Sequence, residues 1–257
     1  MMEVKKSQSN STLLARIKIV KGENFVTIED TKSLANHELI ELITYLMGQS
    51  FIKNCKNVNI LVNSKFNKEV DFLLIENGFK LHDENVTVHK MLDDSSKVEN
   101  GFLLKDLHEL SLAEFKRVLE ESMKGSLNAP SSLNVDEQMR SVELELGPNY
   151  KKSCIIAYDN GNPIGVIMPH IEPGTSEEGR IFYFGIIPSE RGKGKSKLLH
   201  QQALEILKND FMATHYIGCT GHNNIPMLKT FQNNGCTVIE RNKVFKKEKL
   251  KICESKV

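Results

Sequence analysis

The feature that most constrains the fold of this chain is an apolar segment that runs through a glycine loop into a helix. Residues 181–187 form an apolar run typical of a buried strand, and Pro188 ends it. A polar loop with Gly192 and Gly194 follows, and apolar residues then recur at helical spacing up to Leu207. The first-turn N–H groups of a helix and its dipole favour a negative ligand. We therefore expect a site for a phosphate-bearing cofactor.

The loop Arg191-Gly-Lys-Gly-Lys-Ser196 adds three basic side chains around this site. It resembles the Q/R-x-x-G-x-G/A loop of the GNAT acetyltransferase family, with Arg191 at the first position and Gly194 at the fourth. Ser196 replaces the usual last glycine or alanine. The preceding Ile186-x-Pro188 is similar to that family's V-x-P strand end. A Rossmann loop fits less well, because the third glycine is missing and no acidic ribose partner stands out downstream.

The composition is that of an ordinary soluble globular protein. Of 257 residues, 40% are hydrophobic and 26% are charged, and the net charge of +1 argues against a nucleic-acid binder that works through bulk charge. No apolar run approaches the roughly 18 residues of a membrane span, and the first residues lack the apolar core of a signal peptide. The five cysteines are widely spaced, without a C-x-x-C pair. We expect a cytoplasmic protein with reduced thiols, no metal site and no membrane partner.

The first part of the chain has a mixed pattern of strands and helices. A polar segment at 93–100 is the best linker in the sequence. The pattern predicts strands at 13–20 and 25–28 joined by a turn at 21–24, a helix at 33–52, a strand at 58–62, a helix at 69–76 ending at Asn77-Gly78, and a strand at 86–92.

The second part repeats the mixture in the order β-α-α-β-β-β-α-β-α-β, which is the order of the acetyltransferase fold. The predicted elements are a strand at 102–104, a helix at 111–123 with a Ser111–Glu114 capping box, a loop at 125–132, a helix at 135–146, strands at 154–158 and 163–170 around a turn at 159–162, the opening segment, a strand at 215–220, a helix at 226–233 and a strand at 237–245. The resemblance thus covers most of residues 100–250. It implies an α/β (α+β) fold with a mixed, mostly antiparallel central sheet flanked by helices.

An internal repeat supports two related domains, at 1–95 and 96–257. Residues 59–79 align without gaps on residues 216–236, with Asn67 on Asn224. The corresponding strand-to-helix junction of the first half, residues 29–33, has no glycine and carries two carboxylates. We therefore expect a truncated, degenerate first copy and a cofactor in the second half only.

The resemblance also implies roles for residues of the second half. The pantetheine arm of acetyl-CoA would pair with the strand end 184–187, and the amide of Ile186 would stabilise the oxyanion as an amine attacks. The loop amides would hold the pyrophosphate, and Asn224 would contact the pantetheine, although a helix cap explains that residue equally well. The expected cofactor-binding residues are Gly185, Ile186, Ile187, Arg191, Gly192, Lys193, Gly194, Lys195, Ser196, Asn224 and Phe231.

The acid and the base are left open by the sequence. Phe231 stands where many relatives carry the tyrosine that protonates the leaving thiolate, so the thiolate leaves as an anion, another donor serves, or catalysis is lost. Arg180 occupies the position at which some relatives have the glutamate that acts as general base. Glu172 and Glu178 are the expected catalytic carboxylates, acting through water, with Glu177 and His170 on the same hairpin. The alternative for each of these side chains is a solvent-exposed charged residue of a loop without a catalytic role.

The function expected is an acetyl-CoA-dependent N-acetyltransferase that transfers the acetyl group directly to a primary amine of a small molecule or peptide. The alternative is a non-catalytic acyl-CoA-binding or protein-interaction module, which would bind CoA without turnover. An acidic loop at 172–179 favours a cationic amine, and the protein is expected to be a monomer or a homodimer. The basic segment 241–251 is interpreted as the polar face of an edge strand.

Overall fold

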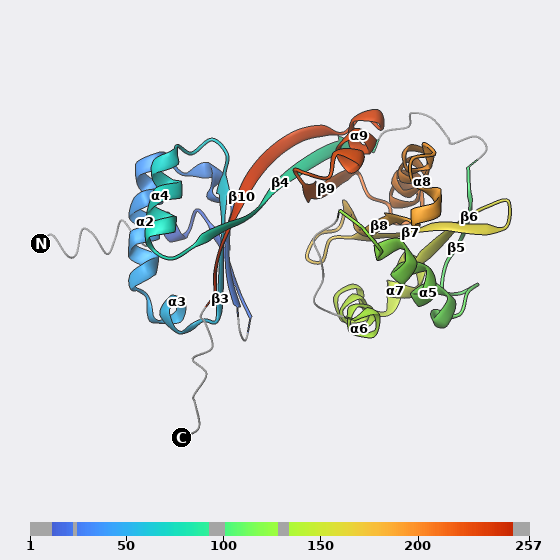
Figure 1. Cartoon of the computed structure of the whole chain (residues 1–257), viewed down its shortest axis with the longest axis horizontal. Coiled ribbons are helices and arrows are strands. Elements are labelled where there is room, and N and C mark those ends of the chain that lie inside the picture. Colours follow the sequence, from blue (N-terminus) through green and yellow to red (C-terminus); the bar gives the residue numbers. More distant parts are fainter. Residues whose placement is uncertain (1–11, 23–24, 93–100, 128–133, 249–257) are drawn as a thin grey trace, which may run out of the picture. The chain divides into compact units, whose positions relative to one another are not determined.

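The computed structural model describes residues 12–22, 25–92, 101–127 and 134–248. The chain forms two compact units, the first made of residues 1–85 with 240–257 and the second of residues 86–239 (Figure 1). The linker predicted at 93–100 lies outside the described residues. Within the described ranges, no helix has the length and apolar character needed to cross a membrane.

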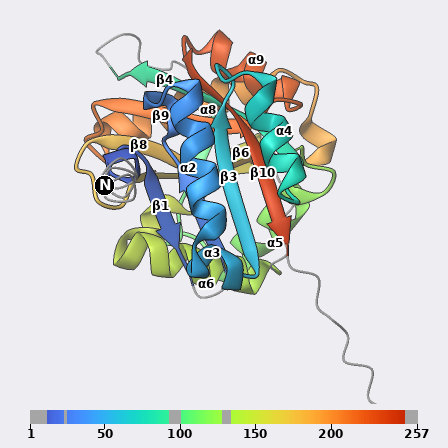
Figure 2. The same ribbon diagram turned by 90° about the vertical axis from the view of Figure 1, so that its left-hand side faces the viewer.

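The first unit is a sheet with helices packed on it. Its strands follow the order β1-β2-β3-β10, and Figure 2 shows α2 and α4 in front of them. Strands β2 and β3 are parallel and the other two pairs are antiparallel. The elements are β1 Lys18–Lys21, β2 Phe25–Glu29, a 3-10 turn Thr31–Ser33, α2 Asn36–Gly48, α3 Ser50–Asn54, β3 Asn57–Asn63, α4 Lys68–Glu76 and the first part of β4 Lys80–Met91.

Three predictions for the first part of the chain were wrong in their bounds, among them the strand predicted at 86–92, which begins at Lys80 and ends at Met91. Residues 12–14 are helical, so the strand predicted from residue 13 begins only at Lys18. The helix predicted at 33–52 is interrupted at Gln49, whose backbone is extended between α2 and α3. Gly48 ends α2, since glycine weakens helical continuity. The end of α4 is confirmed, because Gly78 takes the positive φ of 83° that a helix end favours.

The second unit contains the opening segment. Its strands follow the order β4-β9-β8-β7-β6-β5, of which β8 and β9 are parallel. The elements are the second part of β4, β5 Leu103–Lys105, α5 Leu112–Met123, α6 Val135–Leu146, a 3-10 turn Gly147–Asn149, α7 Tyr150–Ser153, β6 Ile155–Asp159, β7 Asn162–Ile171, β8 Glu178–Ile186, a 3-10 turn Pro188–Glu190, α8 Lys195–Asn209, β9 His215–Gly221, α9 Ile225–Asn233 and the first residues of β10 Thr237–Glu248, whose remainder belongs to the first unit. The predicted mixed, mostly antiparallel sheet with flanking helices is confirmed.

Local turn signals account for much of this unit. Asn160 and Gly161 have φ of 49° and 80°, as expected for the tight hairpin between β6 and β7. Ser111 caps α5 by accepting from the amide of Glu114 at 3.1 Å. The Glu114 carboxylate does not complete the predicted box among the described bonds; it accepts from the Tyr158 hydroxyl at 2.8 Å.

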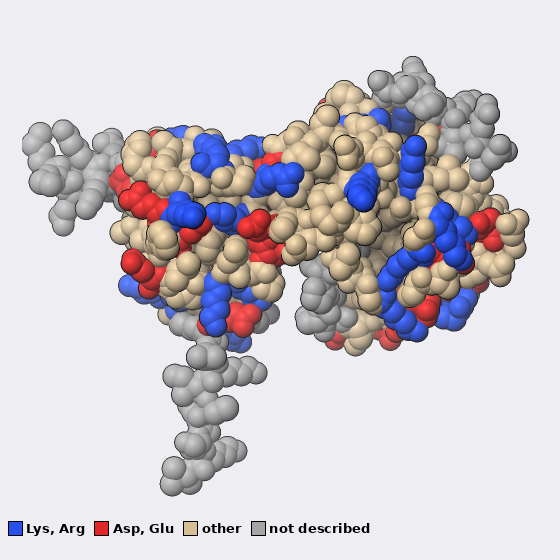
Figure 3. Space-filling model, turned by 45° about the horizontal axis from the view of Figure 1, so that its top comes forward, with Lys and Arg blue, Asp and Glu red and all other residues tan. Residues whose placement is uncertain are grey.

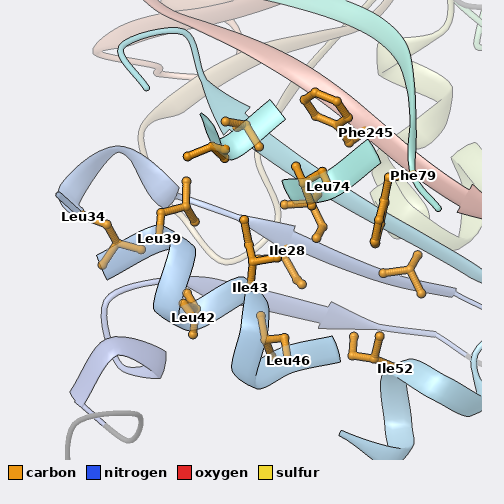
Figure 4. Packing of buried hydrophobic residues seen from close by; sticks show 14 of the residues in the cluster. Ile28, Leu34, Leu39, Leu42, Ile43, Leu46, Ile52, Leu74, Phe79 and Phe245 are labelled. Carbon is orange, nitrogen blue, oxygen red and sulfur yellow. The ribbon is translucent and has the colours of Figure 1, made fainter. Parts of the chain in front are cut away.

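The core of the first unit contains a strand from the far end of the sequence. Phe245 of β10 is buried with Leu74 and Phe79 (Figure 4). Strand β10 pairs along its length with β3, from Asn242 opposite Asn63 to Glu248 opposite Asn57. The prediction of an edge strand at 241–251 is therefore wrong for its described part, because β10 has neighbours on both sides.

The core of the second unit is complemented in the same manner by the first part of the sequence. Val86 and Val88 of β4 are fully buried and pack in one cluster with Tyr216 and Phe231. Each unit thus has a core to which both parts of the sequence contribute. The division of the sequence into related domains at 1–95 and 96–257 stays a prediction.

Candidate active site

Two parallel strands of the second unit separate after a short paired stretch. Strands β8 and β9 pair at Glu178 with His215 and at Gly179 with Tyr216, and the described residues show no further register pair between them. From Arg180 to Ile186, seven residues or about 23 Å of β8, the strand has its backbone edge open on the β9 side. We call this open edge the slot.

The backbone of β8 directs amides into the slot. The amide of Ile187 donates to the carbonyl of Ile164 on β7 at 2.9 Å, and Ile186 lies opposite Gly165. Because N–H groups alternate between the two edges of a strand, the amide of Ile186 points away from β7, toward the slot. The amide of Phe184 has the same direction. Sequence reasoning named only the first of these two amides.

A β-bulge lies in the middle of this strand edge. Ile167 faces Phe184, but Pro169 faces Ile181, so β8 has one residue more than β7 in this interval. Bulges of this kind redirect side chains and are frequent beside active sites. The extra residue could not be found from the apolar pattern of residues 181–187, because the pattern does not specify register.

The loop beyond the slot has the geometry expected of an anion site. Gly192 and Gly194 have φ of 75° and 76°, a backbone conformation that is strained in any residue with a Cβ atom. Gly194 is the N-cap of the 15-residue helix α8. The first-turn amides of α8 have no carbonyl partner within the helix, so they are suited to an anionic ligand. The two glycines predicted from sequence are thus in the conformations that their roles require.

The lysines of the loop are held by carboxylates. Lys193 lies 3.0 Å from Glu190, while Lys195 contacts both Glu190 and, at 2.7 Å, Asp159 of the β6–β7 hairpin. The hydrogen bonds that Glu190 accepts from Lys195 and Lys193 lower the pKa of Glu190, and the hydrogen bonds that Lys195 donates to Asp159 and Glu190 raise the pKa of Lys195. The positive charge predicted for this loop is therefore largely balanced. On the face seen in Figure 3, basic and acidic side chains likewise lie among one another.

Arg191 has a different environment from these lysines. Its Nε donates to the carbonyl of Ile186 at 2.9 Å, and its two terminal nitrogens donate to the carbonyls of Gly125 and Ser122 at 3.0 and 2.9 Å. The side chain thus joins the loop to the end of β8 and to the end of α5.

Comparison with known proteins agrees with this geometry. Residues 114–235, which lie within the second unit, match the family described as Acetyltransferase (GNAT) family. Residues 114–235 form a GNAT domain. Enzymes of this family are N-acetyltransferases that take the acyl group from acetyl-CoA, and the protein is accordingly an acyltransferase. A search of curated proteins gives no match.

Solved structures share the fold over most of the chain. A GCN5-related N-acetyltransferase from Sphaerobacter thermophilus aligns with a TM-score of 0.62 and 12% identity, covering 90% of this chain and 76% of that one. A tandem GNAT protein from the clavulanic acid biosynthesis pathway gives 0.57 and 11%, covering 90% and 78%. A GCN5-related N-acetyltransferase from Kribbella flavida gives 0.52 and 9%, covering 96% of both chains. At these identities the likeness shows the fold.

The polar residues near the end of the slot have structural partners. Asn224 is 7% exposed and caps α9 by accepting from the amide of Met227 at 3.3 Å, while its side-chain amide donates to Thr220 at 3.0 Å. Ser196 accepts from the Thr230 hydroxyl at 3.0 Å, which ties the first turn of α8 to α9. The helix-cap interpretation of Asn224 describes its observed contacts.

Phe231 is part of the core beneath the slot. It is 2% exposed, and its ring centroid lies 5.4 Å from that of His200 and 6.3 Å from that of Tyr216. Burial lowers the pKa of His200 to about 3, so this imidazole is neutral at pH 7. Position 231 therefore offers an aromatic surface and no proton donor.

The structure does not bring the predicted catalytic carboxylates to Ile186. Glu178 lies at the paired start of β8, eight residues or about 26 Å of strand from Ile186. It accepts from Arg180 at 2.6 Å, and Glu172 lies 3.7 Å from the same guanidinium. The two carboxylates thus gather around Arg180, at the opposite end of the slot from the glycine loop.

His170 joins this group from β7. It lies directly opposite Arg180, is 5% exposed, and has its Nε2 3.9 Å from the Glu172 carboxylate. Its pKa is lowered, chiefly by burial. Its place in the apolar run of β7 was the only sequence signal that this histidine is buried.

The first unit has no comparable slot in its described part. Its parallel strands pair at four successive positions, from Phe25 opposite Asn57 to Ile28 opposite Ile60. Beyond this pairing, the Thr31 hydroxyl donates to the carbonyl of Leu61 at 2.9 Å. The strands of this unit are therefore joined where those of the second unit separate.

Proposed function

We propose that this protein is an acetyl-CoA-dependent N-acetyltransferase that transfers the acetyl group directly to a primary amine. The observation that supports this most is the open edge of β8 leading into the glycine loop and the first turn of α8. An extended pantetheine arm can pair with free backbone groups of a strand edge, while the loop amides hold the pyrophosphate. Gly185, Ile187 and the loop residues 191–196 are the proposed contacts.

The amide of Ile186 is the proposed donor to the thioester carbonyl. A backbone N–H fixed by strand pairing on its other edge is preorganised, so it can stabilise the oxyanion that forms as the amine attacks. The attack forms the C–N bond, the C–S bond then breaks, and the amine loses a proton.

The leaving thiolate is proposed to depart as an anion. Phe231 cannot donate a proton, and a thiol with a pKa of about 8.5 is a tolerable leaving group near neutral pH. Glu172 and Glu178, expected from the sequence as bases, lie at Arg180, and Glu178 is about 26 Å of strand from Ile186, so we assign the role of general base to neither.

The acceptor is proposed to be a cationic amine of a small molecule or peptide. The pKa of Glu145 on α6 is raised, first by burial and then by the Glu172 carboxylate. Two carboxylates that repel each other favour a cation between them or beside them. An uncharged amine would lack this attraction.

The decisive experiment measures CoA binding and amine-dependent thiol release separately. Calorimetry with CoA should show binding, and acetyl-CoA with a panel of amines should release free thiol only when an amine is present. Gly194→Glu, which puts a carboxylate and a strained residue at the N-cap of α8, should abolish binding. Gly174→Glu is the matched control, because Gly174 also has a positive φ, 89°, but lies in the β7–β8 loop.

The second candidate is a non-catalytic acyl-CoA-binding or protein-interaction module. The aromatic residue at position 231 and the pairing of Glu178 with Arg180 favour it. It requires CoA binding without thiol release on every amine tested. Amine-dependent thioester cleavage would exclude it, whereas failure of CoA to bind at millimolar concentration would exclude both functions.

A further inference from the structure

The guanidinium of Arg191 donates to three backbone carbonyls from two separate segments of the chain. Nε binds Ile186 at the end of β8, and the two terminal nitrogens bind Ser122 and Gly125 around the end of α5, all at 2.9–3.0 Å. A planar guanidinium presents its donors in a fixed fork, so three such bonds define its position and orientation. The side chain is therefore held between the end of β8 and the end of α5.

The positive charge of Arg191 is placed at a helix C-terminus. Ser122 is in the last turn of α5, and Gly125 follows that helix. The last carbonyls of a helix carry partial negative charge, and an arginine that donates to them is stabilised there. Tyr183 also donates its hydroxyl to the carbonyl of Ser122, at 3.1 Å. The charge of Arg191 thus complements α5 rather than a ligand of the loop.

The same bonds hold the glycine loop in place. The bond from Arg191 Nε to Ile186 closes the chain between the end of β8 and the first residue of the loop, and the amide of Arg191 donates to Pro188 at 3.3 Å. On the other side, Lys195 ties the start of α8 to Asp159 and Glu190. Between these two points lie Gly192 and Gly194, which have little conformational preference of their own.

We propose that Arg191 is a positioning residue for acetyl-CoA, which holds the loop so that its backbone amides meet the pyrophosphate while its guanidinium stays on the α5 carbonyls. The inference rests on the proposed function. A lysine keeps the charge but cannot make three bonds of fixed geometry. Two roles can therefore be distinguished: positioning of the loop needs the planar donor geometry of the guanidinium, whereas a contact with phosphate needs only a positive charge.

The test is the Kd of CoA for the wild type, Arg191→Lys, Arg191→Met and Lys193→Met at low salt and at 1 M NaCl. Both Arg191 variants should weaken binding about tenfold or more, by the same factor at each salt concentration. Lys193→Met should weaken binding mainly at low salt, because an exposed charge attracts a phosphate less when screened. Circular dichroism of the unliganded variants identifies any that fail to fold, and Arg191→Lys is the milder of the two changes.

Three results would overturn the inference. Normal affinity in Arg191→Lys would mean that charge alone suffices. An effect of Arg191→Met that shrinks at 1 M NaCl, as for Lys193→Met, would mean that the guanidinium contacts phosphate. Absence of CoA binding by the wild type would reject the proposed function and this inference with it. If the wild type binds CoA and only the Arg191 variants behave differently from the expectation, the inference is wrong and the proposed function stands.

Discussion

The Thr31 hydroxyl donates to the carbonyl of Leu61 at 2.9 Å and accepts from the amide of Asn63 at 3.3 Å, which joins the parallel strands of the first unit beyond their paired residues. The corresponding place in the second unit is the open slot. We therefore expect one molecule of CoA per chain by calorimetry. In Gly194→Glu no residual binding should be left, because the described part of the first unit has no open strand edge between its parallel strands. A stoichiometry of two, or residual binding in that variant, would contradict this.

We expect Glu190 to compete with the phosphates of CoA for the loop lysines. Its carboxylate binds Lys193 and Lys195, both of which flank the first turn of α8. Glu190→Gln should lower the Kd of CoA several-fold at low salt and less at 1 M NaCl, because it removes a negative charge beside the phosphates. The exposed Glu120 on α5 provides the matched control, Glu120→Gln, which should leave the Kd unchanged. Weaker binding in Glu190→Gln would show that the carboxylate instead helps to shape the loop.

The sequence was most informative where short-range geometry decides the structure. Asn160-Gly161 predicted a hairpin, Ser111 predicted a cap, and Gly78 predicted a helix end, because each residue satisfies a local requirement of φ or of a terminal amide. The placement of β10 was not predicted. Its alternating basic and apolar residues fit an edge strand as well as one that buries Phe245, and the choice depends on a partner, β3, about 180 residues earlier in the chain.

The same distinction holds for the site. The positive φ of Gly192 and Gly194 follows from the loop sequence, and the resemblance in this loop indicated the family. The partners of Arg191 could not be predicted, since they are backbone carbonyls of α5 that any residue type would supply. The direction of the Phe184 and Ile186 amides depends on the register with β7, which the apolar run leaves undefined.

His200 makes the free energy of unfolding depend on pH below about pH 6.5. The folded state keeps this histidine neutral through burial, with Lys90 of β4 disfavouring its charge, and its ring nitrogens face Tyr216 and Asn234. Its pKa is about 3 when folded and about 6.5 when unfolded, so the unfolded state binds the extra proton and stability falls as pH drops below about 6.5.

Replacing His200 with Gln should remove this dependence. Between pH 7 and pH 5 the free energy of unfolding of the wild type, from urea titration, should fall by roughly 2 kcal/mol more than that of the variant. His108→Gln, at an exposed position, should retain the wild-type dependence. Equal pH dependence in the wild type and His200→Gln would mean that the buried ring accepts a proton without unfolding.

Phe231→Tyr tests whether the thiolate leaves without an acid. The new hydroxyl would enter a cluster in which Phe231 is 2% exposed and lies against the rings of His200 and Tyr216. A buried hydroxyl without a partner costs about 1–3 kcal/mol, so the thermal midpoint should fall. The turnover number with a productive amine should not rise, because the proposed mechanism has the thiolate depart as an anion near neutral pH. A turnover number raised tenfold or more in Phe231→Tyr, with an unchanged Kd for CoA, would show instead that protonation of the leaving thiolate limits the rate in this protein.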